Sequence, residues 1–260
     1  MAPKKDYVGE VGSLQDLLDH IAKSTLADSP HAHVRLWFRG HSKEEWELQP
    51  AVYRPEFPSR DEAERLQIER HLTQDFRVES AGLRPGRETE AELYFLQQHY
   101  RMPTRLLDWT TSPLHALYFA TTAGDKSNGE ICMMDAYQLA TSQKAKGFVG
   151  IATGRSLIFE KALQPIFHWQ KPDFPNFILP VRPDQLDPRM RLQRSCFTFH
   201  PPTPHVLTTA ENRSLRLFSV PKDAKGPIKK ALFLLGIDDF TVYGDLESLA
   251  RRLRAAYQIP

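Results

Sequence analysis

The chain has 260 residues, which is enough for one large domain or two small ones. Hydrophobic residues make up 41% of the sequence and charged residues 25%, so a chain that is disordered or fibrous over most of its length is excluded. The formal net charge of +2 excludes a strongly basic protein that coats DNA, while a local basic groove stays open.

The cysteines and the apolar segments argue against further classes of protein. Cys132 and Cys196 stand far apart and no CxxC pair occurs, which argues against a zinc ribbon and a disulfide scaffold. No apolar run approaches the ~20 residues that span a bilayer, and the N-terminal segment lacks the apolar stretch of a secretory signal. We therefore expect a cytoplasmic protein with no membrane partner.

The N-terminal part of the chain is predicted to hold three helices and a strand. Apolar residues at helical spacing predict helices over residues 13–22, 61–81 and 90–100, the second of them solvated and rich in charge. Ser13 is a suitable cap for the first helix. A run of β-branched and aromatic residues predicts a strand over 34–40, ended by a glycine.

Residues 105–120 are predicted to form a strand, a turn and a helix. Arg105–Trp109 is typical of a short buried strand, and a hydroxyl-rich turn that precedes Pro113 is typical of a helix start. The packing face of this helix is predicted to consist of Leu114, Leu117, Tyr118 and Ala120.

The rest of the chain is predicted to be rich in loops and strands, because prolines are frequent between 165 and 205. Strands are predicted over 130–135, 177–181, 195–200, 215–220 and 241–243, and helices over 228–235 and 245–257. The last helix has Leu246, Leu249, Leu253 and Tyr257 on one face. Since no linker divides the chain, we predict one α+β domain over residues 1–260.

A first candidate site lies at the end of the predicted strand 34–40. Arg39 can hold a phosphate or a planar group in bidentate fashion, and Gly40 lets a ligand approach the backbone. The competing interpretation is a strand-end arginine in a structural ion pair.

A second candidate site is the turn between Pro103 and Pro113. Its hydroxyls and the free N–H groups of the helix start could receive an anion. Arg105 and Asp108 could meet in a tight turn, although Asp108 could equally be a cap with Arg105 as its surface partner. His99, just upstream, is a further candidate, while the alternative for it is a structural histidine.

A third candidate site surrounds Gln193, whose amide could contact a ligand in bidentate fashion. Arg189, Arg191 and Arg194 could form a basic rim that steers a polyanion such as nucleic acid, or simply a solvated strand end. Cys196 lies in a strand pattern, and buried thiols are usually inert, so we do not predict a nucleophile there.

Several familiar motifs do not occur in the sequence. The phosphate-binding patterns GxxxxGK[ST] and GxGxxG are missing, and so is the GxSxG pattern of serine hydrolases. There is no HExxH, and the ten histidines show no pairing at metal-ligand spacing. We therefore predict no metal.

Three blocks of sequence carry a family resemblance. The first is Phe38, Arg39 and Gly40, followed by Trp46, Leu48, Pro50, Tyr53 and Arg54. The second runs from Gln98 through Pro103–Thr110 and Pro113 to Ala120, and the third holds Arg189, Gln193 and Phe197, with Ser195 where a glycine is expected. With the closing residues around Tyr243, these blocks resemble the FRG domain family, named for its Phe-Arg-Gly tripeptide, over about residues 14–257.

The resemblance implies a fold and an activity. FRG domains occur in bacteria and phages, often near defence or toxin genes, and are thought to be distant relatives of ADP-ribosyltransferases. These enzymes have a split mixed or antiparallel sheet flanked by helices, and they bind NAD through an arginine or histidine on the first core strand. The resemblance thus implies an NAD-dependent ADP-ribosyltransferase that acts as a toxin or antiphage effector, with an antitoxin as partner.

The resemblance also assigns roles to individual residues. Arg39 would take the position of the NAD-binding arginine, Thr110 to Ser112 would lie near the nicotinamide ribose, and Gln193 near the usual catalytic glutamate, which this block lacks. The residues implied for catalysis are Arg39, Asp108, Gln193 and His99, and those for NAD binding are Phe38, Arg39, Gly40, Thr104, Arg105, Trp109, Thr110, Ser112 and Tyr118. Trp109, Tyr118 or Tyr100 could stack on a ring of the ligand. The acceptor would be a nucleobase reached through the rim of Arg189, Arg191 and Arg194, or else a protein.

Three other functions compete with the transferase. The same cleft could belong to a non-enzymatic module that binds a nucleotide or nucleic acid. A metal-independent nuclease could use His99, Asp108 and Arg105 as acid, base and phosphate clamp. A purely structural partner domain would leave the density of polar residues in the turn before Pro113 unexplained.

Overall fold

The computed structural model describes residues 5–24, 29–123, 126–143, 150–171, 177–184, 188–202, 206–209 and 213–259. Its strands are β1 (Tyr7–Glu10), β2 (Leu36–His41), β3 (Leu106–Thr110), β4 (Gly129–Asp135), β5 (Ala152–Thr153), β6 (Leu179–Arg182), β7 (Ser195–Phe199) and β8 (Leu215–Val220). Its α-helices are α1 (Leu14–Ala22), α2 (Ala32–Arg35), α3 (Glu62–Glu79), α4 (Glu90–His99), α5 (Pro113–Thr121), α6 (Ala136–Ser142), α7 (Leu157–Phe167), α8 (Pro188–Leu192), α9 (Lys222–Leu234), α10 (Asp239–Tyr243) and α11 (Leu246–Ala256). Two short 3-10 turns, η1 (Ala51–Tyr53) and η2 (Ala81–Leu83), flank α3.

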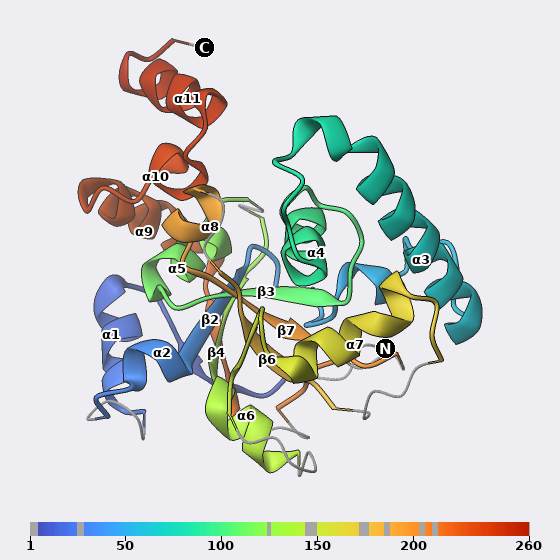
Figure 1. The fold of residues 1–260 in the computed structure, drawn as a ribbon. Helices are drawn as coiled ribbons and strands as arrows, with labels where there is room; N and C mark the ends of the chain where they lie inside the picture. The colour runs from blue at the N-terminus through green and yellow to red at the C-terminus, as the bar shows by residue number, and fades with distance from the viewer. Residues whose placement is uncertain are drawn as a thin grey trace.

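The described strands form one eight-stranded mixed sheet in the order β1-β8-β4-β2-β3-β7-β6-β5. The two outer pairs, β1 with β8 and β5 with β6, are parallel, and the inner pairs are antiparallel. Helices lie around this sheet (Figure 1). The prediction of an α+β fold with a mixed sheet flanked by helices is therefore confirmed.

The sheet is weakly joined at its centre, between β2 and β3. Strand β2 pairs with β4 from Leu36 to His41, whereas it pairs with β3 at a single position, Phe38 with Thr110. Beyond this pair β2 and β3 share no further position of backbone pairing. Backbone groups near the junction therefore need other hydrogen-bonding partners, because an unpaired polar group away from water is costly.

Two groups of helices cover the two halves of the sheet. Helices α3, α4 and α7 bury apolar side chains against β3, β7 and β6, in a core that contains Phe95, Phe159 and Phe197. Helices α1, α5 and α9 bury theirs against β2, β4 and β8. On this face of the sheet the junction between β2 and β3 therefore lies between two cores, whereas a third core with Trp37 of β2 and Trp109 of β3 spans the junction on the other face.

Helix α5 packs against β2 at a distance that only glycine permits. A Cβ atom on Gly40 would stand 1.8 Å from the carbonyl oxygen of Ala116 and 2.7 Å from the nitrogen of Ala120. Both are backbone atoms, which cannot move aside as a flexible side chain does. Gly40 thus fixes the helix that follows the turn at Pro113 directly over the strand that carries Arg39.

Helix α3 was predicted to be solvated, but it carries a buried ion pair on its inner face. Glu69 accepts from Arg105, with Oε2 at 2.8 Å from Nε and 2.7 Å from Nη2, and both side chains are almost inaccessible. Tyr94 donates to the same carboxylate over 2.6 Å and accepts from the backbone N–H of Arg105. Although burial alone would lower the pKa of Arg105, the charge of Glu69 raises it above its usual value. These contacts join α3, α4 and the start of β3.

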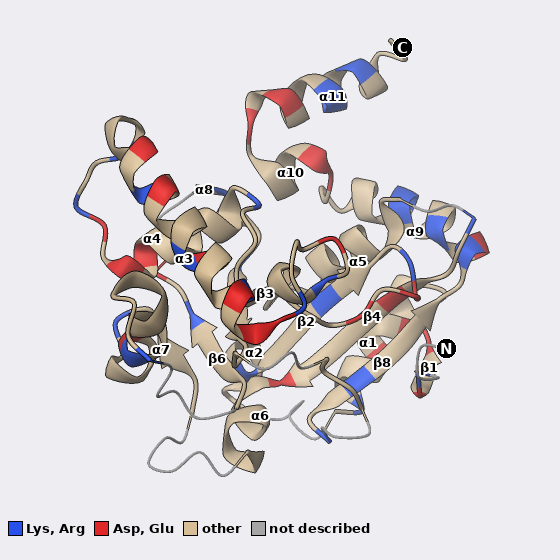
Figure 2. Ribbon diagram, turned by 90° about the vertical axis from the view of Figure 1, so that its right-hand side faces the viewer, with Lys and Arg blue, Asp and Glu red and all other residues tan. Residues whose placement is uncertain are grey.

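Several sequence predictions differ from the structure at the C-terminus. Residues 241–243 were predicted as a strand but belong to helix α10, because Asp238 and Thr241 form a capping box that starts a helical turn. The apolar face predicted for the last helix is not part of a core: Leu246 is 82% and Tyr257 76% exposed. Helices α10 and α11 lie away from the sheet in both Figure 1 and Figure 2.

Other differences are smaller. The strand predicted over 34–40 begins at Leu36, because residues 32–35 form the helical turn α2. Strands β1 and β5 and helices α6, α7 and α8 were not predicted. The remaining predicted helices and strands are present, with ends that shift by a few residues.

We predict that removing one partner of the buried pair of Glu69 and Arg105 destabilises the protein more than removing both. Glu69→Leu leaves the Arg105 charge buried without a counter-ion and should lower the free energy of unfolding by about 3–5 kcal/mol. Glu69→Leu combined with Arg105→Leu should be more stable than the single variant, which urea unfolding would measure. If the double variant is the less stable of the two, the pair does not act as a unit.

Candidate functional site

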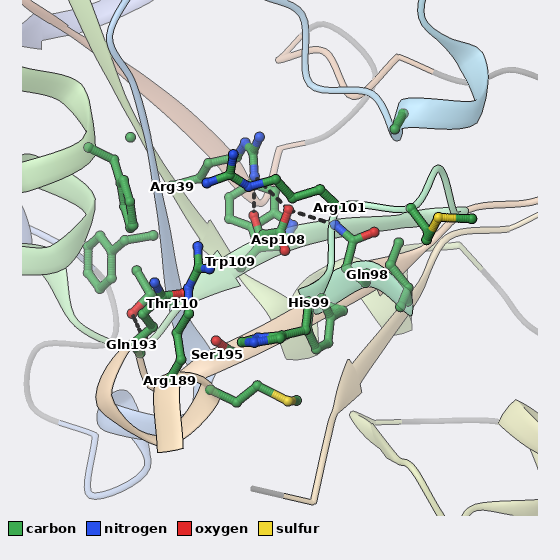
Figure 3. A pocket seen from close by; sticks show the side chains of 18 of the residues that line it. Arg39, Gln98, His99, Arg101, Asp108, Trp109, Thr110, Arg189, Gln193 and Ser195 are labelled. Atoms are coloured by element: carbon green, nitrogen blue, oxygen red, sulfur yellow. Dashed lines mark hydrogen bonds and ion pairs between the residues drawn. The ribbon is translucent and has the colours of Figure 1, made fainter. Parts of the chain in front are cut away.

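A cavity of about 400 Å³ opens at the junction of β2 and β3, and the end of α4 and the segment from α8 to β7 form its other walls (Figure 3). Many of the residues predicted for catalysis or NAD binding line this cavity. Strand β2 contributes Phe38, Arg39 and Gly40, strand β3 contributes Asp108, Trp109 and Thr110, and the remaining ones are His99 and Gln193. Segments far apart in the sequence therefore meet at one place.

Arg39 spans the gap between the two central strands. Its Nη1 donates to the backbone carbonyl of Asp108 over 2.6 Å and lies 3.7 Å from the Asp108 carboxylate. Its Nε donates to His41 Nε2 over 2.8 Å. The guanidinium thus takes the place of a missing ladder hydrogen bond and is held by fixed partners on both sides.

The charge of Arg39 is only partly compensated. Burial lowers the pKa of Arg39 below its usual value; Asp108 opposes this shift, and the nearby positive charge of Arg54 adds to it. An arginine stays protonated at neutral pH even so. An anion that enters the cavity would therefore gain from a guanidinium that is desolvated and already oriented.

Asp108 is held in place from the other side. Gln98 Nε2 donates to its Oδ2 over 2.8 Å, and Thr104 in turn donates to Gln98 Oε1. The Asp108 side chain is 56% exposed, so it faces the cavity while its position is fixed by Gln98. The result is a row of contacts from Thr104 through Gln98 and Asp108 to Arg39.

A second row of contacts runs from Arg39 into the protein. Because Arg39 donates to Nε2 of His41, the proton of the neutral ring lies on Nδ1, 3.1 Å from Glu130 Oε1. Lys5 and Tyr7 both donate to Glu130 Oε2, over 2.8 and 2.9 Å. Burial alone would raise the pKa of Glu130, but the hydrogen bond from His41 and the charge of Lys5 lower it overall.

His41, Glu130 and Cys132 are buried together, with ligand-type atoms within 4.8 Å of one another. This cluster was not predicted, since the residues come from β2 and β4. Lys5 and Arg39 already donate to the carboxylate and the ring, and burial raises the pKa of the Cys132 thiol well above its usual value. A cation here would meet two positive side chains and a protonated thiol, so we assign a hydrogen-bond network to this cluster and no metal.

Thr110 and Gln193 close the end of the cavity where β3 meets β7. Thr110 Oγ1 donates to the Gln193 carbonyl over 2.6 Å and accepts from the backbone N–H of Ser112. Gln193 Nε2 donates to the Val242 carbonyl over 3.1 Å. The Thr110 hydroxyl therefore fixes the turn before β7, and the Gln193 amide is oriented by helix α10.

Four predicted site residues lie outside the cavity. Thr104 is fully buried behind Gln98, and Arg105 is paired with Glu69 in the core. Ser112 caps α5 by accepting from the His115 backbone N–H, and Tyr118 donates to Asp239 over 2.5 Å. Their polar groups are thus used in holding the fold together.

Other predicted roles also change. Trp109 lines the cavity, but its ring is 3% exposed and its Nε1 donates to Thr198, so it cannot stack on a ligand. Arg189 lines the cavity, whereas Arg191 and Arg194 do not. The nuclease hypothesis loses its phosphate clamp, because Arg105 lies apart from His99 and Asp108.

Sequence reasoning did not assign Arg54, Gln98, Arg101, Met102 or Phe119 to the site, although all of them line the cavity. A signal for three of them existed, since Arg54, Gln98 and Phe119 lie inside the blocks that carry the family resemblance. Among the described residues that line the cavity, four are arginines (Arg39, Arg54, Arg101 and Arg189) and one, Asp108, is a carboxylate. This excess of positive charge suits an anionic ligand.

We predict a pH dependence of stability that depends on His41. Burial lowers its pKa from 6.5 to about 4, so the unfolded chain binds a proton in this range more readily than the folded one. The contribution of neutral His41 to the free energy of unfolding is therefore fully present above pH 6.5 and is lost as the pH drops towards 4. The His41→Gln variant should lose about 2 kcal/mol less than the wild type between pH 7 and pH 5, measured by urea unfolding. Equal losses in both proteins would contradict this assignment.

Comparisons with known proteins give one match. Residues 34–129 match the model of the FRG domain. No curated protein and no solved structure gives a significant match. The matched segment includes β2, α4, β3 and α5, which carry Arg39, Gln98, His99 and Asp108, whereas Arg189 and Gln193 lie beyond it. No helix in the described part of the chain is long and apolar enough to cross a membrane.

Proposed function

We propose that this chain, which carries an FRG domain over residues 34–129, is an NAD-dependent ADP-ribosyltransferase with the cavity between β2 and β3 as its active site. The observation that carries the proposal is the meeting of Arg39, Thr110 and Gln193. They come from β2, β3 and the turn that enters β7, and β3 lies between the other two strands. This is the arrangement that the family resemblance implied for the NAD-binding arginine, the hydroxyl-bearing strand and the late strand.

The size and charge of the cavity support NAD as the ligand. Its volume of about 400 Å³ lies in the range of small-molecule sites. Arg39 is desolvated and oriented, and Arg54 and Arg101 add positive charge at the cavity wall, which suits the two phosphates of a dinucleotide. Phe119, which is partly exposed at the cavity wall, supplies apolar surface against which a nicotinamide ring can lie.

The chemistry requires little covalent participation by the protein. The bond between the ribose C1′ and the nicotinamide nitrogen breaks, and its electron pair neutralises the pyridinium ring. The acceptor's nitrogen or oxygen forms a new bond to C1′ and releases a proton. In the transition state the ribose is positively charged, so a nearby carboxylate stabilises it.

Asp108 is the residue suited to this role. Its carboxylate is exposed to the cavity and positioned by Gln98, and it is the sole carboxylate among the described residues of the cavity wall. It can stabilise the ribose cation and accept the proton of the acceptor. Gln193, with its amide held by Val242, can orient the ribose.

A transferase of this kind can act as a toxin, since it consumes NAD or modifies a cellular acceptor. We therefore propose a role as a toxin or antiphage effector in bacteria, kept inactive by an antitoxin partner. Growth arrest on induced expression, lost in the Arg39→Ala variant, would support this role.

We expect the purified protein to transfer label from radioactive NAD to nucleic acid or to a component of a cell lysate, or at least to consume NAD. Arg39→Ala removes the phosphate ligand at the centre of the cavity and should reduce this activity about 100-fold or more. NAD should also raise the melting temperature of the wild type but not of Arg39→Ala. Arg155→Ala, which removes an exposed arginine that does not line the cavity, is the matched control.

If the wild type neither labels an acceptor nor consumes NAD, the proposed transferase activity is wrong. Stabilisation by NAD without turnover would support the non-enzymatic nucleotide-binding module. New strand ends formed in nucleic acid without NAD would support a nuclease.

We predict that Asp108→Asn separates binding from chemistry. The amide keeps the size of the side chain and can still accept from Gln98, but it lacks the negative charge. NAD consumption should fall by about 100-fold, while the melting-temperature increase by NAD is retained. A variant with unchanged turnover would remove Asp108 from the mechanism.

A further inference from the structure

A second hollow of about 430 Å³ adjoins the cavity. The two share His99, Arg101 and Arg189, so these three residues lie between them. The second hollow extends outward between the end of α4, the start of α8 and the end of α10. Its further lining includes Tyr100, Tyr243 and Asp245.

One wall of the second hollow is the turn that ends α4. Arg101 has φ of 63°, in the left-handed region that side chains other than glycine rarely adopt. The turn is closed by backbone hydrogen bonds from Arg101 to Gln98 and from Met102 to Gln97. It places the Tyr100 ring in solvent, 64% exposed, next to the edge-on ring of His99 at 5.0 Å.

The other wall combines an aromatic ring with an arginine. The guanidinium of Arg189 lies 4.8 Å from the centre of the Tyr243 ring. The hydrogen bond from Gln193 to Val242 holds α10 beside α8 at this point. Asp245 adds a carboxylate, which serves as the cap of α11 by accepting from the Ser248 backbone N–H over 2.7 Å.

We infer that the second hollow is the acceptor site and that its ligand is a single-stranded nucleic acid. This inference rests on the proposed function, since it identifies the acceptor of that same active site. Tyr100 offers a base an exposed ring on which to stack, and Arg101 and Arg189 offer its neighbouring phosphates positive charge. Both arginines also face the cavity, so a base that enters from the second hollow arrives at the NAD ribose.

The charge of the second hollow favours a nucleic acid acceptor over a protein acceptor. The second hollow is lined by two arginines, Arg101 and Arg189, against one carboxylate, Asp245. A lysine or arginine side chain of a protein acceptor would therefore meet an excess of positive charge, with Arg54 and Arg39 beyond it. A nucleic acid strand carries one negative charge per nucleotide, so the same residues attract it. The flipped or unpaired base is also the form in which chemistry on a base is accessible.

The transfer to a base balances without a further reactant. The C1′–nicotinamide bond breaks, nicotinamide leaves with the electron pair, and a ring or exocyclic nitrogen, or an oxygen, of the base bonds to C1′. The base then loses a proton to Asp108 or to solvent. The products are ADP-ribosylated nucleic acid, nicotinamide and a proton.

Binding measured without NAD tests this inference independently of catalysis. Fluorescein-labelled oligothymidylate and oligouridylate of about ten nucleotides are titrated with the full chain, and anisotropy reports binding. We expect binding of single strands that weakens with salt and exceeds that of a duplex of the same length. Tyr100→Ala should weaken it about tenfold, and Tyr100→Phe, which keeps the ring, should restore it. Tyr257→Ala removes a similarly exposed tyrosine from α11 and is the matched control.

Several outcomes would overturn the acceptor site while leaving the transferase intact. One is NAD consumption by a wild type that binds no single-stranded oligonucleotide. Two others are equal binding of single strand and duplex, and equal binding by the wild type and Tyr100→Ala. The last is labelling of protein alone in a lysate. Conversely, single-strand binding that depends on Tyr100, without NAD consumption, would support the second hollow as a nucleic-acid-binding site and contradict the transferase.

Discussion

The structure depends on how the gap between β2 and β3 is bridged. The two strands share one pairing, Phe38 with Thr110, and past it Arg39 donates to the Asp108 carbonyl. A guanidinium that replaces a ladder hydrogen bond keeps the strands together and leaves space beside them. The same side chain is thereby desolvated without a full counter-ion. The opening in the sheet and the partly compensated positive charge beside it have a common cause.

Two rows of hydrogen bonds prevent Arg39 and Asp108 from collapsing into a simple ion pair. On one side Gln98 holds the Asp108 carboxylate, and on the other side His41 accepts from Arg39 and donates to Glu130. Because each partner is itself held, neither side chain pays much conformational entropy when a ligand binds. A site of this kind can be positioned before the ligand arrives, as electrostatic catalysis requires.

The helices make the opening permanent. The group formed by α3, α4 and α7 is joined to β3 through the buried pair of Glu69 and Arg105, while α5 packs on β2 at the contact distance that Gly40 allows. On one face each half of the sheet is thus packed against its own helices, while on the other face the core with Trp37 and Trp109 spans both halves. The cavity lies where the two packed units meet, and helix α10 reaches its rim through Gln193. The transferase and the nucleic acid groove that we propose both use this meeting point.

Local sequence determined most elements of the fold and one centre of the site. The spacing of apolar residues located α1, α3, α4 and α5, and the strand with a terminal glycine located Arg39, because period and capping are local properties. Local patterns were wrong at residues 241–243, where strand-forming residues follow Asp238 in a capping box and become a helix. They were also wrong about the apolar face of α11, since a pattern does not say whether a partner surface exists within the chain.

The tertiary structure alone decided which polar residues share a site. Arg105 directly precedes β3 and Arg39 lies within β2, yet the first meets Glu69 of α3 in the core and the second faces the cavity. Arg101 entered the site through a left-handed turn that no spacing predicts. The sequence thus determined the strands, helices and turn chemistry, because these follow from interactions between near neighbours. Which charges are paired and which face a ligand depends on contacts between residues far apart in the chain, and those form only when the sheet and both groups of helices assemble.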